Sequence, residues 1–587
     1  MKTFYSDEKN TQIVISLLKQ HDVKKVIASP GSTNICFLAS IQQDPWFEIY
    51  SAVDERSAAY IACGLSFESG EPVVINCTGA SSSRNYMPGL TEAYYRKLPI
   101  IAITSSQISS KIGHLVAQVT DRTNPPFDTA KYSATVPFVK DEDDIWDCEV
   151  KVNNALLECR RAGGGPVHLN LETKYSRNFN IQELPTYRKI DRITLTDKFP
   201  TLPKGKIAIF IGAHAKMSNE QITAIDNFCI NNNAVAFCDL TSNYKSKYAL
   251  NFSLVSGQHY TNKTKFTPDL LIHIGEISGD YYNLGMCKSA KNVWRINEDG
   301  EIRDTFRKLT YVFEMPIANF FNHYSTPNVK DNSYYTACNN ELIRLRSLIP
   351  EVPFSNLWIA NKIAHLIPEN STLHLGILNS LRAWNMFEIP KNVNSMSNVG
   401  AFGIDGCTST LIGASLYNKK QLHYLIIGDL AFFYDLNVIG NRHIGNNVRI
   451  LLVNNGGGIE FKNHGIHNLT KEDINLYIAA SGHHGDKSPN LIKNYAENLG
   501  YEYLTASNKE EFNAVYERFI SPSLTDKSMI FEVFISDEDE RNALTTISNI
   551  ANEIAEQEHG IVHEIKRFVW KNLGDKTTKT IQRIRKR

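Results

Sequence analysis

The chain has 587 residues, of which 42% are hydrophobic and 21% charged, so a globular protein of roughly two to four domains is expected. Lys and Arg total 62, as do Asp and Glu, and this balance gives no electrostatic case for a nucleic-acid partner. No apolar run approaches the ~20 residues of a membrane span, and the N-terminus lacks the apolar segment of a signal peptide. The ten cysteines form no Cys-x-x-Cys pair, which favours reduced thiols in the cytoplasm over a structural zinc site.

Short apolar runs alternate with polar helical stretches along most of the chain. Near-continuous apolar strands separated by helices are typical of parallel sheets covered on both faces. We therefore predict an α/β protein with three consecutive doubly wound parallel-sheet domains, at residues 1–185, 186–345 and 346–545. A helical extension with a basic end is predicted for 546–587, where isoleucines recur at helical spacing. The expected strands include residues 26–28, 73–77, 100–103, 207–212, 234–237, 270–275, 424–427 and 448–453.

The first candidate motif is Asp54-Glu55-Arg56, which follows an extended run over residues 47–53. Open α/β sheets bind ligands at the carboxyl ends of their strands, so Glu55 is placed to act on a ligand. In a water-poor pocket, desolvation would raise its pKa. The same residues also suit a plain helix start near Ser57, with Asp54 as the cap. Local sequence leaves both interpretations open.

The second candidate motif joins Gly428-Asp429-Leu430 to the Asn-Asn-Gly-Gly-Gly run at 454–458. Asp429 follows one apolar strand and Asn455 ends the next, 26 residues later. This spacing suits a strand–helix–strand crossover that brings both side chains to one sheet edge. Together with a carbonyl of the glycine loop they would supply oxygen ligands for Mg²⁺, and the glycines would let phosphates approach the backbone. Asn455-Gly456 is also a common turn pair.

These motifs belong to a longer series that resembles the thiamine-diphosphate-dependent enzymes, and most closely the family of menaquinone-pathway synthases. The resemblance runs over about residues 10–545 and leaves only the C-terminal extension unmatched. The matching stretches, all in the family's order, are residues 29–32, 54–59, 77–79, 397–398, 403–406, 428–430, 434–437 and 454–455.

The resemblance implies a pyrimidine-binding, a central and a diphosphate-binding domain, with thiamine diphosphate and Mg²⁺ as cofactors. It makes Glu55 the activator of the cofactor, Gln118 a catalytic residue that orients a substrate carbonyl, and Ile404 an apolar support. Asp429, Asn455 and Gly457 become the metal ligands. It further implies a homodimer or homotetramer with the active site at the subunit interface. Other implied cofactor contacts are Ser32, Thr78, Gly79, Gly428 and Leu430.

The chain departs from the family where the synthases bind isochorismate and 2-oxoglutarate through arginines and lysines. Guanidinium groups suit carboxylates, so their loss predicts changed substrates. The four positions without the family's charge are Thr33-Asn34, residues 105–108, Asp280-Tyr281 and Val399.

Five residues remain as candidate substrate contacts: Thr33, Asn34, Arg382, His483 and His484. The tandem histidines would be proton donors, or part of a solvated loop. Glu460, beside the cofactor position, would alter the acid–base chemistry or face solvent.

The predicted function is a carboligase that decarboxylates a 2-oxo acid and adds the resulting enamine to an acceptor, both small molecules. Three alternatives stay open: a simple 2-oxo acid decarboxylase, the menaquinone-pathway synthase itself, and a non-catalytic cofactor-binding protein.

Overall fold

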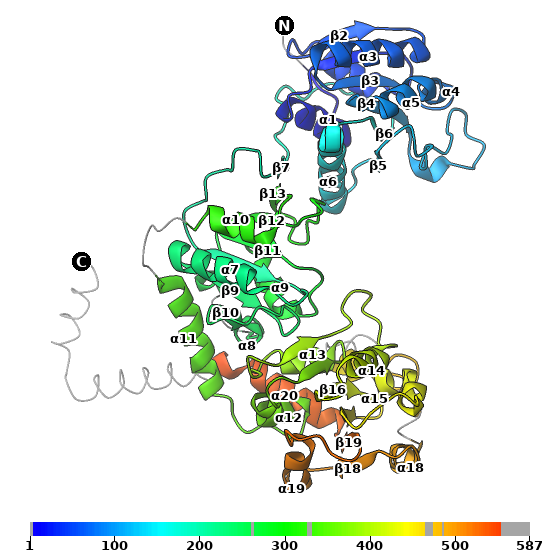
Figure 1. The fold of residues 1–587 in the computed structure, drawn as a ribbon. Helices are drawn as coiled ribbons and strands as arrows, with labels where there is room; N and C mark the ends of the chain where they lie inside the picture. Colours follow the sequence, from blue (N-terminus) through cyan, green and yellow to red (C-terminus); the bar gives the residue numbers. More distant parts are fainter. Residues whose placement is uncertain (1–3, 260–262, 326–331, 464–473, 484–486, 553–587) are drawn as a thin grey trace, which may run out of the picture. The chain divides into compact units, whose positions relative to one another are not determined.

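The structure is a computed structural model that describes residues 4–259, 263–325, 332–463, 474–483 and 487–552 (Figure 1). The chain divides into two compact units. The first comprises residues up to Phe199 together with 298–314, and the second comprises 200–297 and the chain from Met315 onward. No helix within the described ranges is long and apolar enough to cross a membrane. The domain ends expected at 185, 345 and 545 remain predictions.

A six-stranded parallel sheet forms the first unit, in the order β2-β1-β3-β4-β6-β5. Its strands confirm the expected runs at 26–28, 73–77 and 100–103. The strands are β1 (Lys25–Ala28), β2 (Glu48–Ser51), β3 (Val73–Thr78), β4 (Ile100–Gln107), β5 (Tyr132–Val136) and β6 (Val167–Thr173). The helices are α1 (Lys9–Gln20), α2 (Ile35–Ile41), α3 (Glu55–Ser69), α4 (Ser81–Asn85), α5 (Met87–Tyr95) and α6 (Glu142–Glu158).

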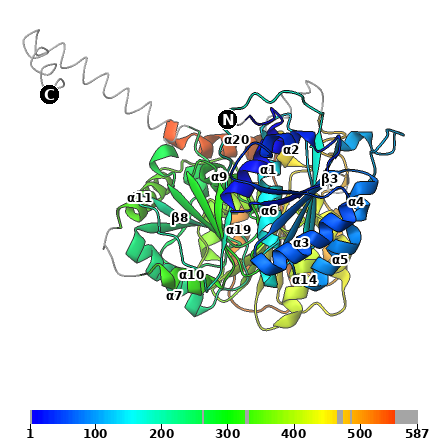
Figure 2. The ribbon, with the colours of Figure 1, turned by 90° about the horizontal axis from the view of Figure 1, so that it is seen from above.

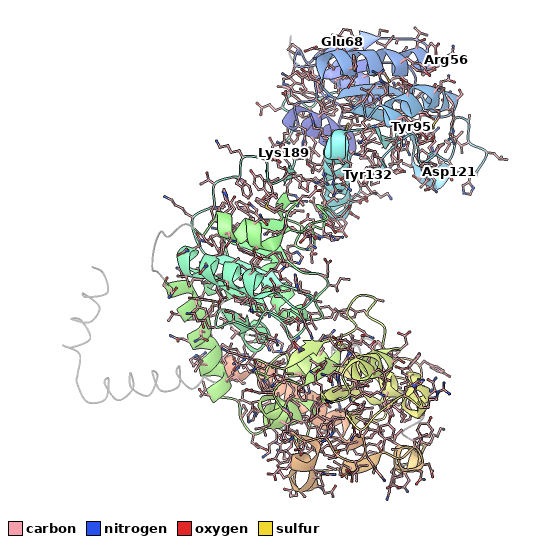
Figure 3. All side chains as sticks on the ribbon, in the orientation of Figure 1. Arg56, Glu68, Tyr95, Asp121, Tyr132 and Lys189 are labelled. Atoms are coloured by element: carbon pink, nitrogen blue, oxygen red, sulfur yellow. The ribbon has the colours of Figure 1, made fainter. Side chains whose placement is uncertain are left out.

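Both faces of this sheet are covered, as its apolar strands require. Along β3, Val74 packs in one core together with residues of α1 and α6. Its neighbours Val73 and Ile75 point to the opposite face, into a second core with α3 and α5. Helices α3 and α5 pack side by side (Figure 2), and the outer surface of α3 carries Arg56 and Glu68 (Figure 3).

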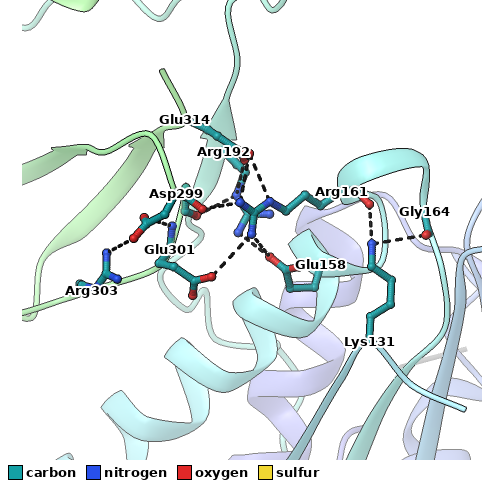
Figure 4. A network of polar contacts seen from close by, with 10 residues as sticks. Lys131, Glu158, Arg161, Gly164, Arg192, Asp299, Glu301, Arg303 and Glu314 are labelled. Carbon is teal, nitrogen blue, oxygen red and sulfur yellow. Dashed lines mark hydrogen bonds and ion pairs between the residues drawn. The ribbon is translucent and has the colours of Figure 1, made fainter. Parts of the chain in front are cut away.

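The segment 298–314 is held in the first unit by a cluster of ion pairs (Figure 4). Arg161 lies 3.3 Å from Glu158 and 3.0 Å from Glu314, and Arg192 lies 2.7 Å from Glu158. All four side chains are at least half-buried, so salt screens these ion pairs less than it screens pairs at an exposed surface. The segment also contributes a strand, since β13 (Leu309–Phe313) pairs in parallel with β7 (Asp191–Ile193).

The second unit begins with a parallel sheet in which β8 is central. Strand β8 (Ile207–Ile211) pairs with β9 (Ala234–Cys238) on one side and β11 (Leu270–Ile274) on the other. β10 (Ala249–Asn251) extends the sheet beyond β9, and β12 (Asn292–Ile296) beyond β11. The expected strands at 207–212, 234–237 and 270–275 are thus confirmed. The helices of this part are α7 (Asn219–Asn232), α8 (Ser253–Ser256), α9 (Tyr281–Cys287), α10 (Ile317–His323) and α11 (Ser333–Ser347).

A third parallel sheet has the order β15-β14-β16-β17-β19-β18. Every strand pair of the described residues is parallel, apart from an isolated antiparallel bridge between Tyr5 and Ile181, so the predicted α/β class with parallel sheets is confirmed. The strands are β14 (Thr372–Leu375), β15 (Asn394–Met396), β16 (His423–Gly428), β17 (Val448–Asn454), β18 (Glu502–Ala506) and β19 (Met529–Phe534). The helices are α12 (Asn356–Ile363), α13 (Asn379–Trp384), α14 (Cys407–Tyr417), α15 (Asp429–Tyr434), α16 (Ile459–Asn463), α18 (Leu491–Asn498), α19 (Lys509–Phe519) and α20 (Asp537–Ser548).

The expected C-terminal extension is described only as far as residue 552. Within this part, α20 ends at Ser548, and Ile547 and Ile550 are buried. The rest of the predicted helix and its basic end lie outside the described residues.

Candidate active site

Asp429 and Asn455 lie at the same edge of the third sheet. Strands β16 and β17 are parallel neighbours, with Gly428 opposite Val453. Asp429 follows the end of β16 as the first residue of α15 and is 3% exposed, while Asn455 directly follows β17. The crossover predicted from the spacing of the two residues is therefore present.

A cavity of about 110 Å³ opens at this edge. Its walls include Asp429, Asn455 and Gly457, and the apolar side chains of Ile404 and Leu430. Residues brought together here thus come from three separate stretches of the sequence, and all had been predicted for one cofactor. Gly428 also lines the cavity.

The glycine loop after β17 has no room for side chains. A Cβ on Gly457 would lie 2.4 Å from the Ser481 hydroxyl and 2.9 Å from the Ala479 carbonyl. Gly456 adopts a φ of 76°, a conformation that favours glycine. The Asn455 amide oxygen accepts a hydrogen bond from Gly457 N at 3.3 Å, so the turn interpretation also holds. That oxygen has a second lone pair for another partner.

These groups fit a Mg²⁺-bound diphosphate. A buried carboxylate, an amide oxygen and loop carbonyls are the hard oxygen ligands that Mg²⁺ prefers. Among the described residues no three His, Cys, Asp or Glu side chains gather in a metal-binding arrangement. The donor set at Asp429 and Asn455 is accordingly not that of a zinc site.

Arg382 and Glu460, both singled out in the sequence, form an ion pair beside the cavity. The Arg382 side chain is 7% exposed, and its guanidinium lies 4.3 Å from the centre of the Tyr281 ring. Tyr281 in turn stacks on Phe402 at 6.0 Å. Glu460 lines the cavity and does not extend freely into solvent. Tyr281 occupies one of the positions where the resemblance leads one to expect a basic residue.

Glu55 lies in the first unit, at the start of α3. Asp54 caps the helix by accepting from Arg56 N at 2.9 Å, so α3 begins two residues earlier than expected and Glu55 is its first residue. The Glu55 carboxylate accepts a hydrogen bond from the Asn85 side chain at 3.1 Å. The cap and the candidate catalytic carboxylate are therefore both present.

The expectation of a raised Glu55 pKa is wrong for the chain by itself. Desolvation acts to raise the pKa, but hydrogen bonds from Asn85 and Ser82 together outweigh it, and the pKa lies below its ordinary value. The reason is that Glu55 is only partly buried, whereas the expectation assumed a closed, water-poor pocket.

Thr33, Thr78 and Gly79 meet at the ends of β3 and β4. The Thr33 hydroxyl contacts the Thr78 hydroxyl, donates to Ser105 O at 2.6 Å and accepts from Gly79 N at 3.4 Å. Asn34 is buried and donates to Ser29 O at 3.0 Å and to the Asn76 side chain at 2.8 Å. These contacts fix the loop after β1; the predicted substrate roles of Thr33 and Asn34 stay predictions.

The other candidate residues lie on exposed loops. Ser32, Gln118 and His483 are exposed, and Gln118 adopts a φ of 64°. This strained backbone is uncommon for a residue with a side chain and is typical of ligand-binding segments. The structure does not bring His483 to the cavity lining, and His484 lies outside the described residues.

Arg122 is a candidate that the sequence did not reveal. It is 5% exposed, and its Nη1 lies 2.6 Å from the position that a Gly79 Cβ would occupy. Nη2 donates to the Asn170 side chain, but Nε and Nη1 have no hydrogen-bond partner. Burial lowers its pKa to about 10. An arginine in a polar loop carries no sequence signal of burial, so only the structure identifies it.

Several large apolar side chains are exposed on the first unit, on β2, α3 and α5 and in the loop before Glu55. Val53 and Tyr60 are 79% and 48% exposed, and Tyr95 at the end of α5 is 68% exposed (Figure 3). Large exposed apolar patches on a protein often mark interaction sites. Further exposed apolar side chains of β2 and α3 are Ile49, Tyr50, Ile61 and Phe67.

Comparison with known proteins agrees with this geometry. Residues 9–124 match the family model described as thiamine pyrophosphate enzyme, N-terminal TPP binding domain. The chain is 28% identical over 572 residues to the 2-succinyl-5-enolpyruvyl-6-hydroxy-3-cyclohexene-1-carboxylate synthase of Phocaeicola vulgatus, across 92% of this chain and 98% of that protein. It is 29% identical over 560 residues to the synthase of the same name from Bacteroides thetaiotaomicron, across 90% and 96%.

Residues 9–124 are thus similar to the N-terminal TPP binding domain of thiamine pyrophosphate enzymes, and the three parallel sheets are consistent with this similarity. Over about 90% of its length the chain is similar to proteins named 2-succinyl-5-enolpyruvyl-6-hydroxy-3-cyclohexene-1-carboxylate synthase.

Proposed function

We propose that the protein is a thiamine-diphosphate- and Mg²⁺-dependent carboligase, which decarboxylates a 2-oxo acid and joins the remaining fragment to an acceptor. The observation that carries the proposal is the convergence of Asp429, Asn455 and Gly457 on one cavity with apolar walls. Bound thiamine diphosphate would supply the carbanion chemistry that decarboxylation and carbon–carbon bond formation need.

The diphosphate half would be held by charge and by a close-fitting backbone. Asp429 and Asn455 would bind the metal together with the Gly457 carbonyl, and the buried position of Asp429 strengthens its attraction for a cation. Ile404 and Leu430 would pack on the apolar rings and exclude water.

Glu55 would hold a hydrogen bond to the pyrimidine ring. Its low pKa in the chain alone describes an ionised carboxylate next to solvent. A second copy packed on the apolar surface around Val53 and Tyr60 would desolvate it and raise its pKa. This surface therefore supports a homodimer or homotetramer in which Glu55 of one copy serves the cavity of another.

Arg122 would receive the carboxylate of the 2-oxo acid. A buried guanidinium with two unpaired nitrogen groups is costly, and a carboxylate offers the matching pair of acceptors. Thr33 stands at the position where the resemblance leads one to expect an arginine, and Gly79 contacts both Thr33 and the Arg122 region. Gln118 would orient the carbonyl of the same substrate.

The acceptor is proposed to differ from that of the synthases. Arg382 is already neutralised by Glu460, so it does not present a free charge to an acceptor carboxylate. An acceptor without a carboxylate at this position fits the pair better. The synthase activity itself remains the second candidate, favoured by similarity across 98% of the Phocaeicola vulgatus protein.

For the location we propose the cytoplasm. All ten cysteines are buried free thiols, and burial raises the pKa of the Cys63 thiol to about 11. Buried thiols with raised pKa values are unreactive, and reduced cysteines are ordinary in a reducing compartment.

Turnover assays separate the candidates. The full chain with thiamine diphosphate and Mg²⁺ is offered pyruvate or 2-oxoglutarate, alone, with aldehyde acceptors or with isochorismate, while CO₂ and products are measured. A coupled product supports the carboligase, and aldehyde as the sole product with every acceptor supports a simple decarboxylase. Turnover only with 2-oxoglutarate and isochorismate identifies the synthase. Cofactor binding without any turnover identifies a non-catalytic protein.

A further inference from the structure

A second and larger cavity lies in the second unit. Its volume is about 570 Å³, within the range of small-molecule sites. The loops after β8, β9 and β11 form one wall, with Ala213, Thr241 and Glu276, and the starts of β14 and β16 form part of the other, with Thr372 and His423. None of its lining residues lines the cavity at Asp429.

The strand order places this cavity where an open α/β sheet binds ligands. From β8 the chain continues to β9 on one side of the sheet and later returns to β11 on the other side. The order therefore reverses at β8, and the crevice beyond the carboxyl ends of such strands is the general ligand site of doubly wound sheets. The proposed carboligase chemistry uses none of these strand ends.

The cavity wall also carries buried polar atoms without partners. His423 is 2% exposed, and neither ring nitrogen reaches a hydrogen-bond partner. The side-chain oxygen of Asn243 and the hydroxyl of Ser397 are likewise buried and unpartnered, and all three residues line the cavity. Buried polar groups are nearly always hydrogen-bonded, so we expect a ligand or a bound water to contact these three side chains.

The charges at the cavity favour an anion. Lys216 and His214 stand at the β8 loop. Burial lowers the pKa of His423; the Asn418 backbone opposes this, and the nearby Lys216 ammonium adds a smaller lowering effect. The one carboxylate of the lining, Glu276, lies 3.7 Å from Arg295. The opposite side carries the apolar groups of Met396, Ala414 and Tyr417.

The cavity and the candidate active site lie at opposite ends of one strand. His423 is the first residue of β16, and Asp429 follows its last residue. At a rise of about 3.3 Å per residue, the strand separates the two positions by roughly 20 Å. A ligand at His423 therefore cannot contact the groups around Asp429 directly.

We propose that this cavity is a second ligand site, which takes a small molecule with one anionic group, a carboxylate or a phosphate, on a partly apolar body. The anionic group faces Lys216 and His423, and the body packs against Met396 and Ala414.

Binding to the full chain tests the proposal without reference to turnover. Benzoate and phenyl phosphate are the two anionic probes, and benzyl alcohol is the uncharged control; all are titrated calorimetrically in the presence of saturating thiamine diphosphate and Mg²⁺. The expected result is one-to-one binding of at least one anionic probe and none of benzyl alcohol. Which of the two binds distinguishes a carboxylate site from a phosphate site.

Two variants locate the binding. Lys216→Met is expected to weaken binding of the anionic probe at least tenfold. The control is Lys288→Met, which changes an exposed lysine of the same unit outside the cavity lining and should leave probe binding unchanged. Ala414→Trp, which fills the cavity, is expected to abolish probe binding and to leave cofactor binding intact. Absence of binding by both anionic probes, or equal binding by the parent, Lys216→Met and Ala414→Trp, overturns the proposal.

Discussion

Arg382 and Glu460, 78 positions apart in the sequence, form a largely buried ion pair beside the candidate cofactor cavity. The pairing offsets the negative charge that Glu460 places next to the cavity, and it offsets the positive charge of the buried Arg382 guanidinium.

Loss of one partner should destabilise the protein. Glu460→Gln removes the carboxylate that pairs with the buried Arg382 guanidinium, and a decrease of about 3 kcal/mol in the free energy of unfolding is expected. The double variant Arg382→Met with Glu460→Leu should recover most of this loss, because apolar side chains of similar size replace buried pairs well. Urea unfolding of the three proteins measures the effect.

The matched control is the pair of Arg96 and Glu92, which are 3.6 Å apart at the end of α5 with both side chains 45% exposed. Glu92→Gln should cost less than about 1 kcal/mol, as exposed pairs do. Equal effects of Glu460→Gln and Glu92→Gln would contradict the account of the buried pair.

Cofactor binding should depend on Mg²⁺ through Asp429. In Asp429→Asn, the Mg²⁺ concentration that half-saturates thiamine diphosphate binding should rise at least tenfold, because a charged oxygen ligand becomes neutral. Calorimetric titration of the cofactor at several Mg²⁺ concentrations measures this. Asp526→Asn, at an exposed position, is the control and should match the parent. Parent-like cofactor binding in chelator would argue against the metal.

Arg122 should affect substrate binding and stability in opposite directions. Arg122→Met removes a buried guanidinium with unpaired donors, so the free energy of unfolding should stay the same or increase. The KM for the 2-oxo acid should rise about 30- to 100-fold, the equivalent of a lost charged hydrogen-bond pair. Arg96→Met, on the exposed end of α5, should change neither. A purely structural Arg122 would instead lose stability and keep its KM.

Glu540 should make stability depend on pH. It is 2% exposed, accepts from Asn356 N at 3.0 Å, and burial raises its pKa to about 7. Between the ordinary pKa and this value the folded chain binds more protons than the unfolded chain, so stability falls as the pH rises from about 4.5 to about 7.

The variant Glu540→Gln mimics the protonated form and should lose the pH dependence that Glu540 causes. At pH 8 its free energy of unfolding should exceed that of the parent by roughly 2–3 kcal/mol. Thermal unfolding at pH 5, 6, 7 and 8 measures the difference. Because Asn356 and Asn379 line the cofactor cavity and both contact Glu540, cofactor affinity is a second readout. A parallel pH profile of parent and variant would disprove the assignment.

The sheets, and the part of the candidate site at Asp429 and Asn455, could be predicted from the sequence, because both depend on local patterns. Apolar runs such as 424–427 and 448–453 form buried strands wherever helices cover both faces, and 26 residues between Asp429 and Asn455 permit one crossover between neighbours. The residues at the ends of such strands share an edge by geometry alone.

Other features depend on tertiary contacts and were not predictable. Burial of Arg122 follows from how its loop lies against Gly79, and the pairing of Arg382 with Glu460 requires α13 and α16 to be adjacent. The lowered pKa of Glu55 in the chain by itself depends on Asn85, on Ser82 and on exposure, none of which the motif around Glu55 contains.

The most direct test of the account mixes two inactive variants. Glu55→Gln and Asp429→Asn should each fold, and each should fail to accelerate hydrogen–deuterium exchange at C2 of the thiamine diphosphate thiazolium ring, measured by NMR without any substrate. If Glu55 of one copy serves the Asp429 cavity of another, a one-to-one mixture after subunit exchange contains dimers with one intact site. About a quarter of the parental exchange rate is then expected. No recovery on mixing, or parental exchange in Glu55→Gln alone, would contradict the central claim that these two residues build one site.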